Sequence, residues 1–111
     1  MGKYYMEYFD EDDDNYAIGR NSYSKKETVI KEGCEYLSGK SDGRIEIMGG
    51  GLIEPAMIIR KAKKTKTMPN RAFILETPRH FMTPNGLGVI YDEIPLDKSG
   101  RAIKHKAQNK E

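Results

Sequence analysis

The amino-acid sequence predicts an α+β fold: a mainly antiparallel sheet of five to six short strands, with one helix at about residues 25–38 packed on one face. Several short segments alternate apolar and polar residues, as half-buried strands do. Clusters of Gly, Pro, Asn and Asp separate these segments and are typical of turns. Only one segment spaces its apolar residues as a helix does. The 111 residues suit a single domain, expected at 1–103, before a polar basic tail at 104–111.

The first strand is predicted at residues 3–9, where Tyr4, Met6 and Tyr8 fall on one face. Aromatic residues fit the half-buried surface of a pleated sheet. The acidic run that starts at Asp10 ends this strand, and residues 16–20 resume an extended pattern. The two segments are therefore expected to form a β-hairpin.

The helix is predicted from its ends as well as from its spacing. Ser24 and Glu27 have the separation of a capping box, in which each side chain bonds to the other residue's backbone N–H. Ile30, Cys34 and Leu37 follow at positions i, i+4 and i+7 and form one apolar stripe. A glycine comes directly after the predicted last turn, where a left-handed cap would end the helix.

Shorter strands are predicted in the second half of the chain. Residues 44–48 alternate, and Gly49–Gly51 then predicts a bend. Residues 56–59 suit a strand or a short helix, and the neighbouring strands favour a strand. The remaining strands are expected at 72–76 and at 89–91, the second stopped near Pro95. Residues 77–79 are expected to be irregular, and Thr83-Pro84-Asn85-Gly86 predicts a turn.

The same sequence gives no sign of a membrane segment. Its longest aliphatic run, residues 56–59, is far shorter than the roughly 20 residues of a spanning helix. The first residues lack the basic start and apolar stretch of a signal peptide. A single cysteine permits no internal disulfide. These features predict a cytoplasmic protein without a membrane partner.

Charge is divided unevenly along the chain. Residues 1–59 carry 7 Lys and Arg against 12 Asp and Glu, whereas residues 60–111 carry 12 against 5. Such asymmetry is typical of proteins with a charged partner. It is equally compatible with two halves that neutralise each other within the fold.

A basic hairpin at residues 60–71 is the strongest functional feature of the sequence, because it contains no acidic residue. Lysines and arginines that follow a phosphate backbone bind nucleic acid by releasing counterions, without reading sequence. The leading hypothesis is a small non-catalytic binding module for an anionic partner, most of all a nucleic-acid backbone, with an acidic protein surface as another partner. Lysines that protect a strand edge from aggregation are the competing explanation. The predicted contact residues are Arg60, Lys61, Lys63, Lys64, Lys66, Arg71 and Arg79. Lys98, Arg101, Lys104 and Lys106 could extend this patch.

The alternative hypothesis is a protein–protein adaptor or an inhibitor of a larger machine, of the kind that mobile elements encode. Its docking surface would be the acidic hairpin, which could imitate the charge of a nucleic acid. The acidic and basic halves could also pair between copies in a homo-oligomer. The predicted docking residues are Asp10, Glu11, Asp12, Asp13 and Asp14.

No complete catalytic motif is present, and neither an enzyme, a metal nor a cofactor is expected. The acidic run begins like a calcium loop, but Asn15 and Asn21 replace the Gly and Glu that such a loop requires. With one cysteine and two histidines, no compact zinc site can be assembled. Cys34 is expected to be buried and inert. An enzyme would need His80 beside Asp92 or Glu93.

Overall fold

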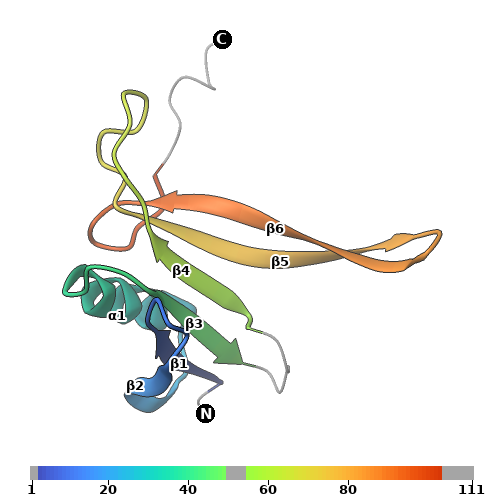
Figure 1. The fold of residues 1–111 in the computed structure, drawn as a ribbon, viewed down its shortest axis with the longest axis horizontal. Coiled ribbons are helices and arrows are strands. Elements are labelled where there is room, and N and C mark those ends of the chain that lie inside the picture. Colours follow the sequence, from blue (N-terminus) through green and yellow to red (C-terminus); the bar gives the residue numbers. More distant parts are fainter. Residues whose placement is uncertain (1–2, 50–54, 104–111) are drawn as a thin grey trace.

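The computed structural model describes residues 3–49 and 55–103. They form one antiparallel six-stranded sheet, in the order β2-β1-β3-β4-β5-β6, with a single helix (Figure 1). The predicted α+β fold class is confirmed. The elements are β1 (Tyr4–Phe9), β2 (Asn15–Tyr23), α1 (Lys26–Ser38), β3 (Arg44–Gly49), β4 (Met57–Lys61), β5 (Phe73–Thr83) and β6 (Gly86–Leu96).

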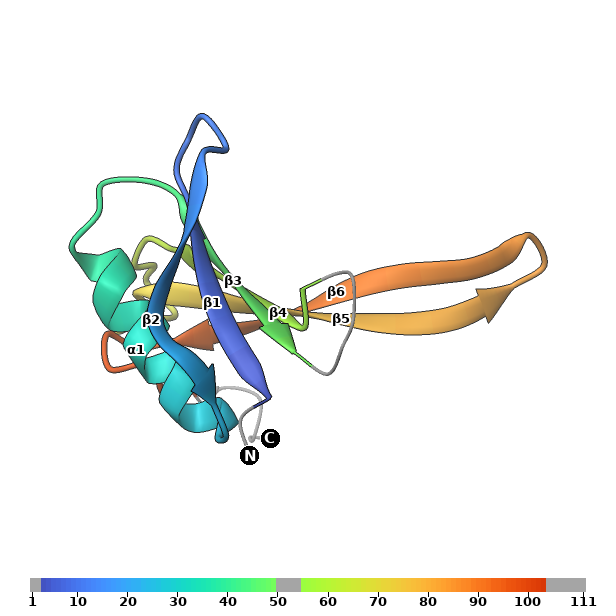
Figure 2. The same cartoon turned by 90° about the horizontal axis from the view of Figure 1, so that it is seen from below.

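The core lies between α1 and one face of the sheet (Figure 2). The apolar stripe of α1 is buried at Val29, Cys34 and Leu37, which are fully enclosed. Alternation in β3 and β4 turns Ile45 and Ile59 toward the helix, and both are fully buried as well. No helix of the described residues covers the other face of the sheet. That face carries one ion pair within β3, Arg44–Glu46, and one between β4 and β5, Arg60–Glu76. One apolar layer therefore determines which face of the sheet the helix occupies.

The predicted opening hairpin is confirmed, because β1 pairs antiparallel with β2, with Tyr8 opposite Tyr16. On its other side β1 pairs with β3, so that Phe9 lies opposite Arg44. Met6 and Tyr8 are buried, as the alternation predicts. The hydroxyl of Tyr8 donates to the backbone O of Asp42 at 2.8 Å and so ties the loop after α1 to the sheet.

Both predicted helix caps are wrong. Strand β2 runs to Tyr23, and Lys25 rather than Ser24 occupies the N-cap position, with no hydrogen bond from a side chain to the helix end. Gly39 has φ −87°, which is not left-handed. Its N–H donates to the backbone O of Tyr36 at 3.2 Å and closes the helix with a tight turn. The left-handed conformation occurs four residues later, at Gly43, with φ 100°.

Residues 57–61 form a strand, as the favoured interpretation predicts. β4 pairs with β3 on one side, with Ile59 opposite Ile45, and with β5 on the other side. Of the predicted bend, Gly49 ends β3, and Gly50 and Gly51 lie outside the described residues. The predicted tail at 104–111 also lies outside them.

β5 and β6 are longer than predicted. The prediction that residues 77–79 are irregular is wrong, because they belong to β5. Pro78 lies within β5, opposite Tyr91 of β6. A proline has no backbone N–H and is tolerated in a strand that has a free edge. β4 pairs with β5 only as far as Glu76, so β5 has such an edge from residue 77 onward. The predicted turn at residues 83–86 is confirmed, and Gly86 has φ 122°.

Beyond β4 the two strands continue as a ribbon that projects from the sheet (Figures 1 and 2). We call residues 77–92 the β5–β6 arm. The opposite ends of the same strands lie beside the end of β4, because Lys61 is opposite Phe73 and Phe73 is opposite Leu96. The loops that leave the sheet at that end therefore lie close together.

The two glycines after α1 should respond differently to alanine. At Gly43, a Cβ would lie 2.5 Å from the backbone O of Phe9, on a residue with φ 100°. Gly43→Ala should lower the free energy of unfolding by about 1–3 kcal/mol, because it strains the backbone. Gly39→Ala is the matched control, since its Cβ would meet nothing closer than 3.6 Å. Urea unfolding followed by circular dichroism measures both, and equal destabilisation would contradict this geometry.

Candidate anion-binding site

The loop between β4 and β5, residues 62–72, has a defined conformation. The N–H of Met68 donates to Oγ1 of Thr65 at 2.9 Å, and the N–H of Thr65 donates to the backbone O of Met68 at 3.1 Å. Nε of Arg71 donates to the backbone O of Lys63 at 2.8 Å. These bonds connect the two sides of the loop. These residues, which we call the basic loop, are therefore held in one conformation by hydrogen bonds of their own.

A basic groove lies beside this loop, where it meets the end of α1 and the loop after β6. Its volume is about 460 Å³. The floor is apolar and includes the buried ring of Phe73. We use the name basic groove for the space lined by five cationic side chains. They are Lys61, Lys63, Lys64, Arg71 and Lys98.

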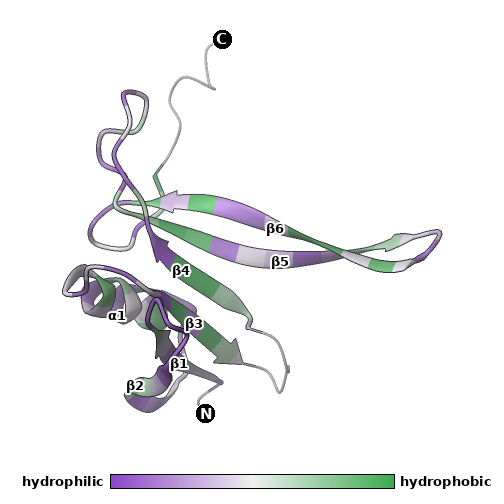
Figure 3. Ribbon diagram, viewed as in Figure 1, coloured by the Kyte–Doolittle hydropathy of each residue, from purple (hydrophilic) through white to green (hydrophobic). Residues whose placement is uncertain are grey.

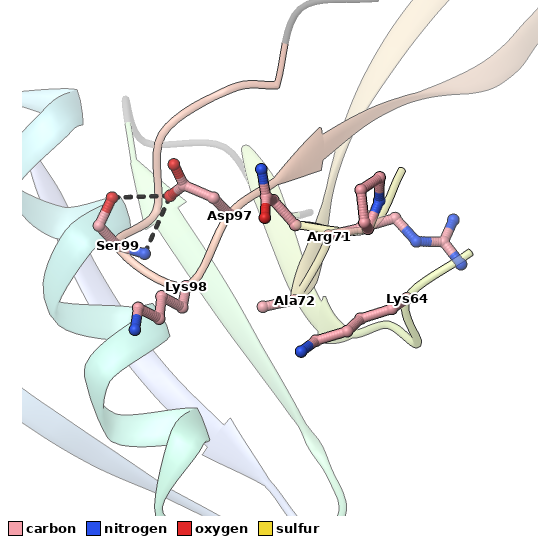
Figure 4. A pocket seen from close by; sticks show the side chains of 8 residues that line it. Lys64, Arg71, Ala72, Asp97, Lys98 and Ser99 are labelled. Atoms are coloured by element: carbon pink, nitrogen blue, oxygen red, sulfur yellow. Dashed lines mark hydrogen bonds between the residues drawn. The ribbon is translucent and has the colours of Figure 1, made fainter. Parts of the chain in front are cut away.

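Lys98, which the sequence suggests as an extension of the basic patch, lines the groove. Its loop is folded by Asp97, whose Oδ1 accepts from the N–H and the hydroxyl of Ser99 at 2.9 and 2.6 Å, and from the N–H of Arg101 at 3.0 Å. The bond from the Ser99 hydroxyl is the main cause that lowers the pKa of Asp97. In Figure 4, Lys98 and Lys64 extend on either side of Ala72. The pairing of the end of β6 with the start of β5 places the loop that contains Lys98 beside the basic loop.

A second, adjoining pocket of about 340 Å³ lies between the same two loops (Figure 4). Lys64, Arg71 and Lys98 line it together with Asp97. Among the described residues, Asp97 is the only acidic residue that lines either space. One carboxylate against the three cationic side chains of Lys64, Arg71 and Lys98 offsets the positive charge of this pocket only in part.

Two predicted contact residues lie away from the groove. Arg60 is on the uncovered face of the sheet, and its Nε donates to Glu76 at 3.0 Å. Arg79 is on the β5–β6 arm and forms two hydrogen bonds with Asp92, at 3.0 and 3.1 Å. This contact raises the pKa of Arg79 and lowers that of Asp92. Both guanidinium groups are thus engaged within the protein.

The remaining predicted cations lie together at one end of the sheet. Lys61 and Arg71 are in the groove, and Nζ of Lys61 donates to the backbone O of Lys40. Lys63 and Lys64 line the groove, whereas Lys66 lies farther along the loop and is exposed. Within the described residues, the side chains of Lys63, Lys64, Lys66 and Lys98 form no ion pair.

The acidic hairpin leaves the sheet at the same end but does not contact the basic loop through an ion pair. Oδ1 of Asp10 accepts from the N–H groups of Asp12 and Asp14, at 2.9 and 3.0 Å, and so shapes the turn. Asp13 pairs with Arg44 of β3 at 2.9 Å. Strand β3 separates β1 from β4 in the sheet. No ion pair of the described residues joins residues 3–49 to the basic loop.

Two of the groups considered for catalysis lie apart, Cys34 in the core and Asp92 on the β5–β6 arm. Cys34 is buried in the core, and burial raises the pKa of its thiol to about 12, with smaller contributions from Asp97 and Glu35. A nucleophilic cysteine needs the opposite shift. Asp92 is held by Arg79. Across residues 3–49 and 55–103, no three His, Cys, Asp or Glu side chains are placed to share a metal ion.

Comparisons with protein-family models, with curated protein sequences and with solved structures find no match to this chain. In the part of the chain that the structure describes, no helix has the length and apolar character needed to cross a bilayer.

Cys34 should be unreactive in the folded protein. A thiol with a pKa of about 12 contains almost no thiolate at neutral pH, and the side chain is fully buried. Ellman's reagent at pH 8 should therefore label it only after unfolding in guanidinium chloride. Complete labelling of the native protein within the mixing time would show that the helix does not cover this residue.

Proposed function

We propose that the protein is a small non-catalytic binding module whose basic groove and loop contact an anionic partner, most of all a nucleic-acid backbone. The observation that carries this proposal is a set of four lysines, on two adjacent loops, that form no ion pair within the described residues. Lys63, Lys64, Lys66 and Lys98 are exposed and project from two adjacent loops. Charges that merely balanced the acidic half would be found in ion pairs with it.

The chemistry of the groove favours backbone contact over base recognition. Lysine acts on phosphate as a point charge, whereas base recognition in a groove relies mainly on bidentate groups such as arginine. Arg71 uses its Nε within the loop, and the ring of Phe73 is buried and cannot stack on a base. We therefore expect binding with little sequence preference and a strong dependence on salt.

Replacement of three loop lysines tests the proposal. The variant Lys63→Glu, Lys64→Glu, Lys66→Glu should lose nearly all affinity for a labelled DNA or RNA duplex, because each lost contact no longer releases counterions. In the wild type, log K should fall linearly with log of salt concentration between about 50 and 200 mM. Fluorescence anisotropy measures both quantities. Salt-independent binding by the wild type would refute the proposal.

The chain offers a control with the same change in net charge. Three exposed lysines lie at the opposite end of the sheet: Lys3, Lys25 and Lys26. The backbone N–H of Lys3 donates to the backbone O of Tyr23, just before α1. The variant Lys3→Glu, Lys25→Glu, Lys26→Glu should retain most of the affinity. An equal loss in both triple variants would mean that net charge, not the basic loop, governs binding.

A protein partner that docks on the acidic hairpin is the second candidate. Its supporting observation is that Glu11, Asp12 and Asp14 are exposed on a turn that Asp10 holds in shape. Their side chains form no ion pair within the described residues. Nuclease treatment of a captured complex separates the two candidates, since only a nucleic-acid partner would be lost.

A further inference from the structure

The β5–β6 arm has no support from the rest of the sheet. β4 pairs with β5 only from Phe73 to Glu76, whereas β6 pairs with β5 along its whole length, to the turn at Thr83. Residues 77–92 are therefore a ribbon of two strands alone (Figure 1). A two-stranded hairpin is only marginally stable in water unless its side chains pack against something.

One face of this ribbon, which we call the apolar face, is apolar apart from His80. Because side chains alternate along a strand, successive cross-strand pairs fall on the same face at every second position. On this face, Met82 and Leu87 are 76% and 72% exposed, and Tyr91 is 43% exposed. Hydrophobic segments near the end of the arm are visible in Figure 3. The pairs on the apolar face are Pro78–Tyr91, His80–Val89 and Met82–Leu87.

The outer edge of β6 is a second exposed feature of the arm, because β6 is the last strand of the sheet. In the described residues β6 pairs with β5 alone, apart from one bridge from Leu96 to Ala102, so its other edge has open backbone groups along the arm. Natural proteins protect such edges with lysine, proline or inward charges. Residues 87–91 read Leu-Gly-Val-Ile-Tyr and contain none of these. An unprotected apolar edge of this kind pairs readily with another strand.

The charge of the arm argues for a protein and against an anionic partner. Its charged side chains in residues 77–92 are Arg79 and Asp92, which neutralise each other in one ion pair. Nothing on the arm therefore attracts a phosphate backbone. Two copies of the arm would meet without net repulsion.

We propose that two copies of this chain associate through their β5–β6 arms, with the apolar face of each arm packed against that of the other. Packing of two identical faces about a two-fold axis gives a closed dimer. The six side chains of the three pairs on this face, at roughly half exposure and about 200 Å² each, amount to about 600 Å² per copy. Two copies would bury about 1,200 Å², the lower limit for a stable interface.

This interface is independent of the proposed binding of nucleic acid. The arm ends at the turn of residues 83–86, whereas the basic groove lies at the other end of β5, about 35 Å away along an extended strand. Loss of the dimer should therefore leave binding at each groove in place. The two proposals can fail separately.

Sedimentation equilibrium and light scattering of the full chain test the dimer. The wild type should have twice the monomer mass of 12.7 kDa at micromolar concentrations. Leu87→Lys and Tyr91→Lys should each raise the dissociation constant at least about tenfold, because each places a charge in the apolar interface. Tyr5→Lys is the matched control for Tyr91→Lys, since Tyr5 is 44% exposed on β1. It should leave the dimer unchanged.

Far-ultraviolet circular dichroism and a thermal melt establish that each variant is folded, and Met82→Gln provides a milder test if Leu87→Lys is not. A wild type that is monomeric at about 100 µM would overturn the proposal, as would a dimer that survives both arm variants. Open-ended growth into larger species would overturn the closed dimer. Sedimentation of a monomer with neutral phosphatidylcholine vesicles, abolished by Leu87→Lys, would assign the apolar face to a lipid surface instead.

Discussion

The packing of α1 against the central strands is the interaction on which the rest of the structure depends. Val29, Cys34 and Leu37 meet the inward residues of the sheet, among them Ile45 and Ile59, and all five are fully buried. Most of the apolar residues at the centre of the sheet are buried in this layer. It also has a limited extent, because one helix of 13 residues cannot cover six strands. The β5–β6 arm extends beyond it, and its apolar side chains remain exposed.

The two charged segments separate for a topological reason. The acidic turn joins β1 to β2, and the basic loop joins β4 to β5, so β3 lies between them in the sheet. Arg44, at the start of β3, pairs with Asp13 of the acidic turn. The basic loop instead meets the loop after β6, where Lys98 adds to the positive charge of the basic groove. The sheet order thereby concentrates unpaired lysines at one place.

The sequence predicted most features that depend on local pattern, although both helix caps were wrong. Alternation identified β1 and β3, the neighbouring strands favoured β4 as a strand, and the helical stripe identified α1. Prediction from the sequence failed where the structure of a residue depends on contacts with a distant part of the chain. Pro78 suggested an irregular segment, but the pairing with β6 keeps it in a strand whose other edge is free. Arg60 and Arg79 could not be separated from the loop lysines, because their partners Glu76 and Asp92 are on adjacent strands. Lys98 was suggested as an extension of the patch, but its place beside the loop lysines follows from the pairing of β6 with the start of β5.

We propose that the basic loop and groove form the contact surface for the anionic partner. Amide chemical-shift mapping by NMR, with a short DNA duplex added to the labelled protein, would locate that surface. The largest shifts should fall in residues 62–72 and 97–101 and should disappear as salt is raised. Shifts concentrated in the acidic turn or on the exposed side of α1, or no shifts at low salt, would contradict it.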